Sequence, residues 1–149
     1  MTIHLRFFRY LLVLALFLSF APRIIAETSD FVARLAPLPV DFRSARTITG
    51  GGDLRAQLDG SQLIVNGQFE GLSAAATSAH LHQGPLAIPG PAIADLQVTH
   101  ATAGKISGTV QLSPEQLEHL HNRALYIQIH SAAAPDGNLR GWLFASPVQ

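Results

Sequence analysis

The sequence predicts an all-β fold: a Greek-key antiparallel β-sandwich or barrel with one short helix before the last two strands. Short segments that alternate polar and apolar residues recur along the chain, and links rich in Gly, Pro and Ala separate them. Several short strands divided by turn signals are typical of sandwiches and barrels rather than of a parallel α/β sheet. The 149 residues include no cysteine, so packing rather than disulfides must stabilise the fold.

The first 26 residues have the pattern of a secretory signal peptide. Arg6 and Arg9 precede the apolar run Tyr10–Leu18, and polar residues interrupt this run from Ser19 onward. The run is much shorter than the roughly 20 residues that span a bilayer. We therefore expect cleavage after Ala26, an exported protein that is periplasmic or secreted, and no membrane span in the mature chain. A retained membrane anchor is the alternative.

The rest of the chain has the length of one domain with a single core. We divide it into a leading strand with an irregular segment, residues 27–51, and the body of the domain, residues 52–149. Ten basic and ten acidic residues balance over the whole chain, and the expected signal peptide contains arginines but no acidic residue. The mature domain is thus close to neutral or slightly acidic, which does not indicate nucleic-acid binding.

A leading strand and a hairpin are the first expected elements. The strand lies near Phe31–Leu35, before an irregular stretch that contains prolines. Asp53–Leu58 alternates polar and apolar residues, Asp59–Gly60 is a turn signal, and Leu63–Phe69 returns as the second strand of the hairpin. Further strands are expected at Ser78–Gln83, Ala92–His100, Lys105–Leu112, Leu125–His130 and Leu139–Phe144.

One short helix interrupts this series of strands. Ser113 is a helix N-cap, Pro114 fits the first helical position, and Gln116 completes a capping box. The helix should end near Arg123. The alternation of faces along the strands predicts a core that includes Leu63, Val65, Leu81, Ile127, Ile129 and Leu143.

Three histidines form the candidate site. On a strand, His80 and His82 project to one side while Leu81 projects to the other, and the same rule places His130 opposite Ile129. We expect all three imidazoles on outer faces, where they converge if their two strands are neighbours. Three neutral imidazoles suit copper or zinc, with one position open for water or a fourth ligand. The alternative is that they are ordinary surface residues.

Other polar residues are weaker candidates for the site. His100 ends a strand and is a candidate fourth ligand, although an exposed strand end explains it equally well. His119 and His121 lie two residues apart on the helix, point in different directions and are expected at the surface. Arg140 has two possible roles, which are to hold an anion near the metal or to tie down the turn Pro135–Asn138 through carbonyl hydrogen bonds.

Three segments in this order resemble the CHRD domain, the module first described in chordin. They are Thr77–Pro85, Tyr126–Ser131 and Pro135–Gly141. The hairpin with Phe69–Leu72 and the helix before the last strands fit the same family. The resemblance covers nearly all of the mature chain and implies an exported β domain, because CHRD domains occur alone in many exported bacterial proteins. The family's biochemical role is poorly defined.

A fainter similarity links the chain to copper/zinc superoxide dismutases. It implies that His80, His82 and His130 are copper ligands and that Arg140 guides or holds an anion. The metal-bridging histidine loop, the zinc ligands and the disulfide of the dismutases have no counterpart, because Gln83–Pro91 contains no histidine, aspartate or cysteine. This difference counts against dismutase activity more than against metal binding.

The sequence therefore predicts an exported CHRD protein that binds a transition metal, copper before zinc, through His80, His82 and His130. No Ser-His-Asp arrangement, phosphate-binding loop or carboxylate pair is visible, so no catalytic residue is assigned and a binding protein is favoured over an enzyme. Two alternatives remain. One is a metal-free module that binds an extracytoplasmic protein partner, and the other is a copper-dependent redox enzyme.

Overall fold

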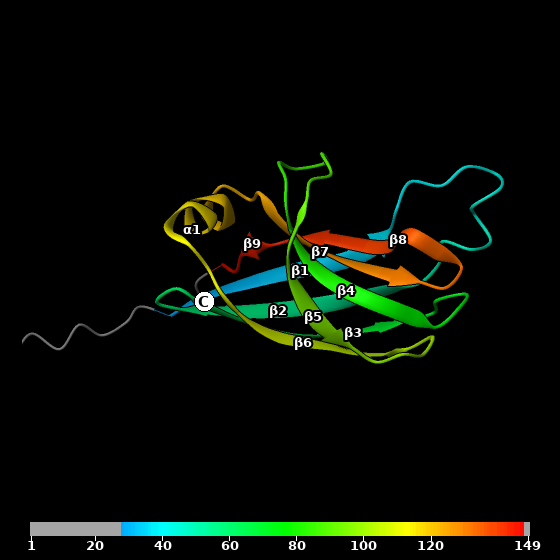
Figure 1. Cartoon of the computed structure of the whole chain (residues 1–149), viewed down its shortest axis with the longest axis horizontal. Coiled ribbons are helices and arrows are strands. Elements are labelled where there is room, and N and C mark those ends of the chain that lie inside the picture. Colours follow the sequence, from blue (N-terminus) through cyan, green and yellow to red (C-terminus); the bar gives the residue numbers. More distant parts are fainter. Residues whose placement is uncertain (1–27, 148–149) are drawn as a thin grey trace, which may run out of the picture.

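The computed structural model describes residues 28–147. Eight antiparallel strands close into a barrel in the order β1-β2-β3-β6-β5-β4-β7-β8, and a ninth strand of two residues, β9, lies beside β1 (Figure 1). The predicted all-β class is confirmed. The strands are β1 (Ser29–Pro37), β2 (Gly51–Asp59), β3 (Gln62–Glu70), β4 (Ala76–Gln83), β5 (Ala92–Val98), β6 (Gly104–Gln111), β7 (Leu125–Ser131), β8 (Ala134–Trp142) and β9 (Phe144–Ala145).

The order of strands is that of a Greek key. Strands β4, β5 and β6 are consecutive antiparallel neighbours, whereas β3 pairs with β6 and β7 pairs with β4. The two connections that skip strands, from β3 to β4 and from β6 to β7, give this arrangement its name. It places β4 beside β7, although the helix and two other strands separate them in the sequence.

The leading strand β1 closes the barrel. It pairs with β2 along most of its length, with β8 at Ala36 and Pro37, and with β9 at Phe31 and Val32. Phe31 is 2% exposed and belongs to the same core as the side chains of the other strands. The expected leading strand is thus part of the barrel rather than an extension beside it.

The core follows the alternation of faces that the sequence predicts. Six side chains expected inside are fully buried, each with 0% exposure: Leu63, Val65, Leu81, Ile127, Ile129 and Leu143. Tyr126 is 1% exposed although it projects from the outer face of β7, the face of Gln128 and His130. Another part of the chain must therefore cover the Tyr126 side chain on the outside of the barrel.

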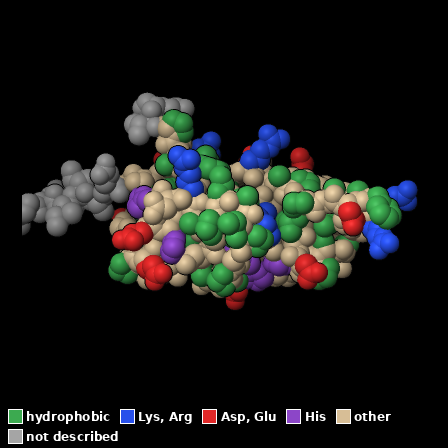
Figure 2. Space-filling view, turned by 90° about the horizontal axis from the view of Figure 1, so that it is seen from above, with side chains coloured by type: hydrophobic (Ala, Val, Ile, Leu, Met, Phe, Trp, Pro, Cys, Tyr) green, Lys and Arg blue, Asp and Glu red, His purple; other side chains and the backbone are tan. Residues whose placement is uncertain are grey.

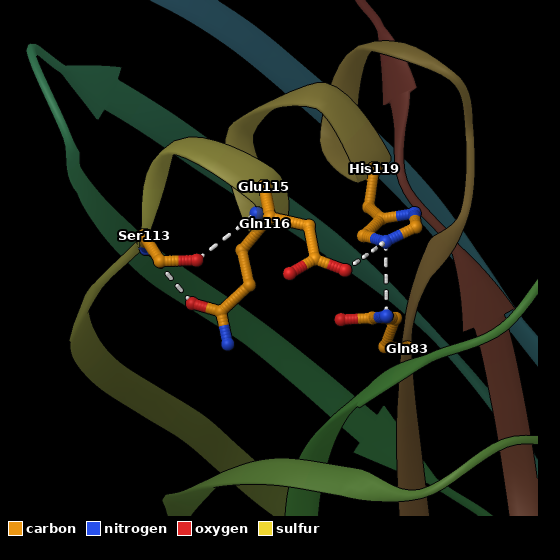
Figure 3. A network of polar contacts seen from close by, with 5 residues as sticks. All are labelled: Gln83, Ser113, Glu115, Gln116 and His119. Atoms are coloured by element: carbon orange, nitrogen blue, oxygen red, sulfur yellow. Dashed lines mark hydrogen bonds and ion pairs between the residues drawn. The ribbon is translucent and has the colours of Figure 1, made fainter.

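The helix α1 (Pro114–His121) begins with the predicted capping box. Ser113 Oγ accepts a hydrogen bond from the Gln116 amide, and the Gln116 side chain accepts one from the Ser113 amide (Figure 3). His119 Nε2 lies 2.9 Å from Gln83 Nε2 and 3.6 Å from Glu115 Oε1, so the helix is joined to the end of β4 (Figure 3).

The end of the chain differs from the expectation. The helix precedes three strands, because β9 separates from β8 at Leu143. The expected turn Pro135–Asn138 lies within β8, and Ser131 pairs with Ala134 to make the hairpin instead. A register shift between Ile129 and Ser131 accompanies this hairpin, and such a bulge tolerates a proline near a strand end.

The expected signal peptide lies outside the described residues. Between residues 28 and 147, no helix has the length and apolar content needed to cross a membrane.

Candidate metal centre

The pairing of β4 with β7 brings three histidines together. Ser78 is opposite His130, and His80 is opposite Gln128, so alternate residues of both strands share one outer face. His80, His82 and His130 each offer one ring nitrogen, and these nitrogens all lie within 4.8 Å of one another. The expected convergence of the two strands is confirmed.

The three rings are close but not packed into a parallel stack. The His80 centroid is 5.0 Å from that of His130 and 5.9 Å from that of His82, with edge-on geometry in both pairs. The centroids of His82 and His130 are 6.4 Å apart. The space between the rings is bordered by ring nitrogens, as three ligands of one ion require.

Backbone carbonyls orient two of the rings. His82 Nδ1 lies 2.9 Å from the Gly90 carbonyl oxygen, and His130 Nδ1 lies 2.7 Å from that of Pro135. A carbonyl oxygen only accepts, so each Nδ1 carries the hydrogen and each neutral ring keeps its lone pair on Nε2. Histidine ligands of metals almost always donate their other N–H in this way.

The Nε2 atom of His82 is buried and has no hydrogen-bond partner among the described residues. A buried acceptor without a partner is costly, at about 1–3 kcal/mol. A metal ion bound to this lone pair would remove that cost.

The remaining ring contacts are longer. His80 Nε2 is 3.6 Å from Asp95 Oδ1, and the Asp95 side chain is 96% exposed, so this pair is weak. Gln128 Nε2 is 3.3 Å from His130 Nε2, which is a long hydrogen bond that an arriving metal can replace.

The loop between β4 and β5, residues 84–91, covers part of the site and rises from the barrel (Figure 1). The Tyr126 hydroxyl donates to the Gly90 carbonyl and accepts from the Gly90 amide, each at 3.0 Å. Trp142 Nε1 donates to the Gly84 carbonyl at 3.2 Å, which holds the other end of the loop. His82 is stacked on Tyr126 with centroids 4.8 Å apart.

This loop encloses one of the two histidines that β4 places on its outer face. His82 is only 9% exposed, because the loop and Tyr126 enclose it, whereas the side chain of His80 is 24% exposed. The facing rule correctly separates the two sides of the strand, but it does not include a loop that folds back over the outer side.

Arg140 is hydrogen-bonded to Gln128, which links it to the β7–β8 hairpin. Arg140 Nε donates to Gln128 Oε1 at 2.8 Å, and Gln128 Nε2 donates to the Asp136 carbonyl at 3.1 Å. Its guanidinium carbon lies 5.1 Å from the Tyr126 ring centroid and 5.7 Å from that of Trp142. Of the two roles considered for Arg140, the structure shows a form of the structural one: Arg140 reaches the turn carbonyl of Asp136 indirectly, through Gln128.

Burial lowers the pKa of two of the three histidines. For His80, desolvation is the main cause, His130 adds to it and Asp95 opposes it. For His82, desolvation is again the main cause of the lower pKa. The hydrogen bond to Gly90 raises the pKa, and the positive charge of Arg140 lowers it. Both shifts favour the neutral imidazole, which is the form that binds metals.

The other histidines lie elsewhere. His100 is exposed two residues beyond the end of β5, with Nδ1 3.1 Å from the Ala76 carbonyl oxygen, and it is not part of the cluster. His119 contacts Gln83, and His121 lies 6.1 Å from Phe31 between ring centroids.

Sequence reasoning missed the residues that surround the three histidines. Tyr126 and Gln128 alternate with buried isoleucines as His130 does, so the same facing rule places them beside it. The carbonyls of Gly90 and Pro135 carry no signal in the sequence, because every residue has a carbonyl.

The CHRD domain family model matches residues 35–143 of the chain. No curated protein and no solved structure matches it.

Proposed function

The chain belongs to the CHRD domain family, and from this premise we propose that it is an exported protein that binds a transition-metal ion, copper, through His80, His82 and His130. The observation that carries the proposal is the convergence of three ring nitrogens within 4.8 Å, one of them the buried and unpartnered Nε2 of His82. The expected signal peptide supports the extracytoplasmic location.

A metal role explains the contacts of the site better than a structural role. The carbonyls of Gly90 and Pro135 occupy the Nδ1 atoms of His82 and His130 and leave both Nε2 lone pairs directed away from these bonds. A purely structural histidine cluster would require donors for these lone pairs. His82 has none among the described residues, and His130 has only the long contact to Gln128.

The donor set favours copper. Affinity of a nitrogen site for divalent metals rises to copper and is lower for zinc. Three neutral imidazoles without a thiolate or a carboxylate in the cluster leave a further position for water. The exposed edge of the site, on the side of His80, gives such a water a route from solvent.

A metal-free binding module is the second candidate function. Its supporting observation is the tip of the loop at residues 84–91, where Leu86 is 53% exposed and Ile88 is 58% exposed. Two large apolar side chains on a projecting loop are suited to contact a protein partner.

The deciding experiment is a competitive copper titration of His80→Ala, His82→Ala and His130→Ala, with zinc as a second ion. Each substitution should weaken copper binding by more than about 100-fold, which exceeds the effect typical of outer hydrogen-bond partners. Electron paramagnetic resonance of the copper-loaded parent should show coupling to nitrogen ligands. His100→Ala, His119→Ala and His121→Ala are the matched controls and should bind copper as the parent does.

A parent-like copper affinity of His130→Ala would show that β4 and β7 do not share a site. The binding-module function would then take precedence.

A further inference from the structure

A second surface feature lies on the outer face of the barrel over β1, β2, β3 and β6, the strands that do not carry the three histidines. A groove with a volume of about 1300 Å³ crosses these strands and reaches β8 at its far side. Ala87, from the loop at residues 84–91, and Leu38 lie among its borders. Basic and amide side chains line it: Arg34, Arg55, Lys105, Arg140, Asn66 and Gln68.

The strand registers align the polar side chains of the groove in two rows. The first row runs through Arg34, Asp53, Gln68 and Lys105. The second row runs through Arg55, Asn66 and Ser107. Adjacent strands lie about 4.8 Å apart, so the first row extends over about 14 Å. This is the length of an extended chain segment rather than of a single small ion.

Positive charge is concentrated in the groove. The described residues include seven Lys and Arg and nine Asp and Glu, yet four of the basic side chains and only one acidic side chain, Asp53, line the groove. Figure 2 shows Lys and Arg side chains at the upper margin and at the right end of this view, and histidines at the left and at the lower margin. Between residues 28 and 147, the two ion pairs within 4.0 Å are His80–Asp95 and His119–Glu115. No Lys or Arg side chain of this part of the chain is therefore neutralised by an ion pair.

Apolar and aromatic surface accompanies these charges. Trp142 of β8 is half-buried and Phe144 of β9 is 38% exposed, and both line the groove. An aromatic ring offers a flat apolar face, amide and hydroxyl groups match sugar hydroxyls, and arginine matches carboxylates. The backbone of these strands is already paired on both sides, so an extended peptide has no free edge to join.

We propose that this groove binds an acidic polysaccharide, with Arg34, Arg55 and Lys105 contacting its carboxylates and Trp142 contacting a sugar face. The groove contains none of the three histidines, although it meets their face at Arg140 and Trp142 of β8, and the proposed binding requires no bound metal.

The test uses the mature, metal-free protein and polygalacturonate as the probe. Trp142 is the single tryptophan of the chain, so its fluorescence reports occupancy of the groove directly. Arg34→Ser/Arg55→Ser and, independently, Lys105→Ser should weaken polygalacturonate binding, the double variant by about tenfold or more. Arg43→Ser/Arg46→Ser removes the same charge from exposed positions outside the groove and should remain within about twofold of the parent.

Two further probes separate the chemistry. Dextran, which has sugars without carboxylates, and poly-glutamate, which has carboxylates without sugars, should both bind at least about tenfold more weakly than polygalacturonate. The proposal is wrong if dextran or poly-glutamate binds as tightly as polygalacturonate. It is also wrong if Arg34→Ser/Arg55→Ser and Arg43→Ser/Arg46→Ser lose the same affinity for polygalacturonate. His80→Ala/His82→Ala should lose copper and keep polygalacturonate, so failure of the metal proposal and failure of this one are distinguishable.

Discussion

Two outer faces of one barrel are built in different ways. Over β4, β7 and β8, hydrogen bonds hold the side chains and the loop at residues 84–91 covers them, so that His82 is only 9% exposed. Over β1, β2, β3 and β6, residues such as Arg34 and Arg55 are exposed. Contacts between side chains and backbone hold the first face in place, whereas the second presents separate exposed charges. Substitutions should therefore be strongly coupled on the first face and additive on the second.

Gly90→Ala should have the largest effect. A Cβ at Gly90 would collide with the Gln83 carbonyl oxygen and approach the Gln83 carbonyl carbon to 3.0 Å, and both are backbone atoms that cannot move alone. We expect a loss of about 2 kcal/mol in the free energy of unfolding. Copper affinity should fall by about 10- to 100-fold, because the Gly90 carbonyl no longer orients His82. Urea unfolding and copper titration measure the two effects.

Gly51→Ala, at the edge of the other face, is the control for this prediction. The nearest atom to its Cβ would be the Leu35 carbonyl oxygen at 3.6 Å, which is ordinary contact. Its stability should be unchanged or slightly raised. Equal losses in both variants would remove the distinction between the two faces.

Tyr126→Phe should have the next largest effect. It removes the hydroxyl that binds the amide and the carbonyl of Gly90, and it leaves the Gly90 amide without its partner. We expect a loss of about 1 kcal/mol in the free energy of unfolding. Amide hydrogen exchange should increase at residues 84–91 but not in β1 to β3. Unchanged exchange in the loop would mean that other contacts hold it.

The inner side of the barrel and the position of the site were accessible from sequence because both depend on local alternation. Leu81 and Ile129 point inward while His80 and His130 point outward, and this period of two holds without any knowledge of distant contacts. The capping box of Ser113 and Gln116 is equally local. The pairing of β4 with β7 was only a condition in the sequence analysis: a Greek key permits it, and the structure shows it.

Features that depend on contacts between distant residues were missed. The burial of His82 requires the loop at residues 84–91 to return and meet Tyr126, which is 36 residues from Gly90. The hairpin between β7 and β8 depends on a register shift after Ile129 that periodicity does not reveal. The basic groove takes Arg34, Arg55 and Lys105 from three separate strands, and each of them alone is an ordinary outward residue.

The third prediction concerns pH and distinguishes the faces by titration. Folding lowers the pKa of His80 and of His82, mainly because both rings are partly buried. The nearby His130 lowers both pKa values further, and Arg140 lowers that of His82. Asp95 raises the pKa of His80 and so opposes the shift. In the metal-free protein, the unfolded chain therefore binds more protons than the folded one below about pH 6.5. The free energy of unfolding should decrease as pH falls through this range. His80→Ala/His82→Ala should show a smaller decrease, as measured by urea unfolding at several pH values. An identical slope in parent and variant would show that other groups cause it.

The smallest expected effect comes from the open face. Arg34 and Arg55 are exposed and form no ion pair within 4.0 Å among residues 28–147, so little in the folded state depends on them. Arg34→Ser/Arg55→Ser should change the free energy of unfolding by no more than about 0.5 kcal/mol. Copper affinity should also match that of the parent, because the hydrogen bonds and ion pairs that the structure describes for the three histidines involve neither arginine, and salt screens exposed charges. Arg140→Ser is the informative comparison, because Arg140 lines the groove and also bonds Gln128 beside His130. It should reduce both polygalacturonate binding and copper affinity. If Arg34→Ser/Arg55→Ser changed copper affinity as much as Arg140→Ser did, the two faces would be coupled through the barrel and their separate construction would not be real.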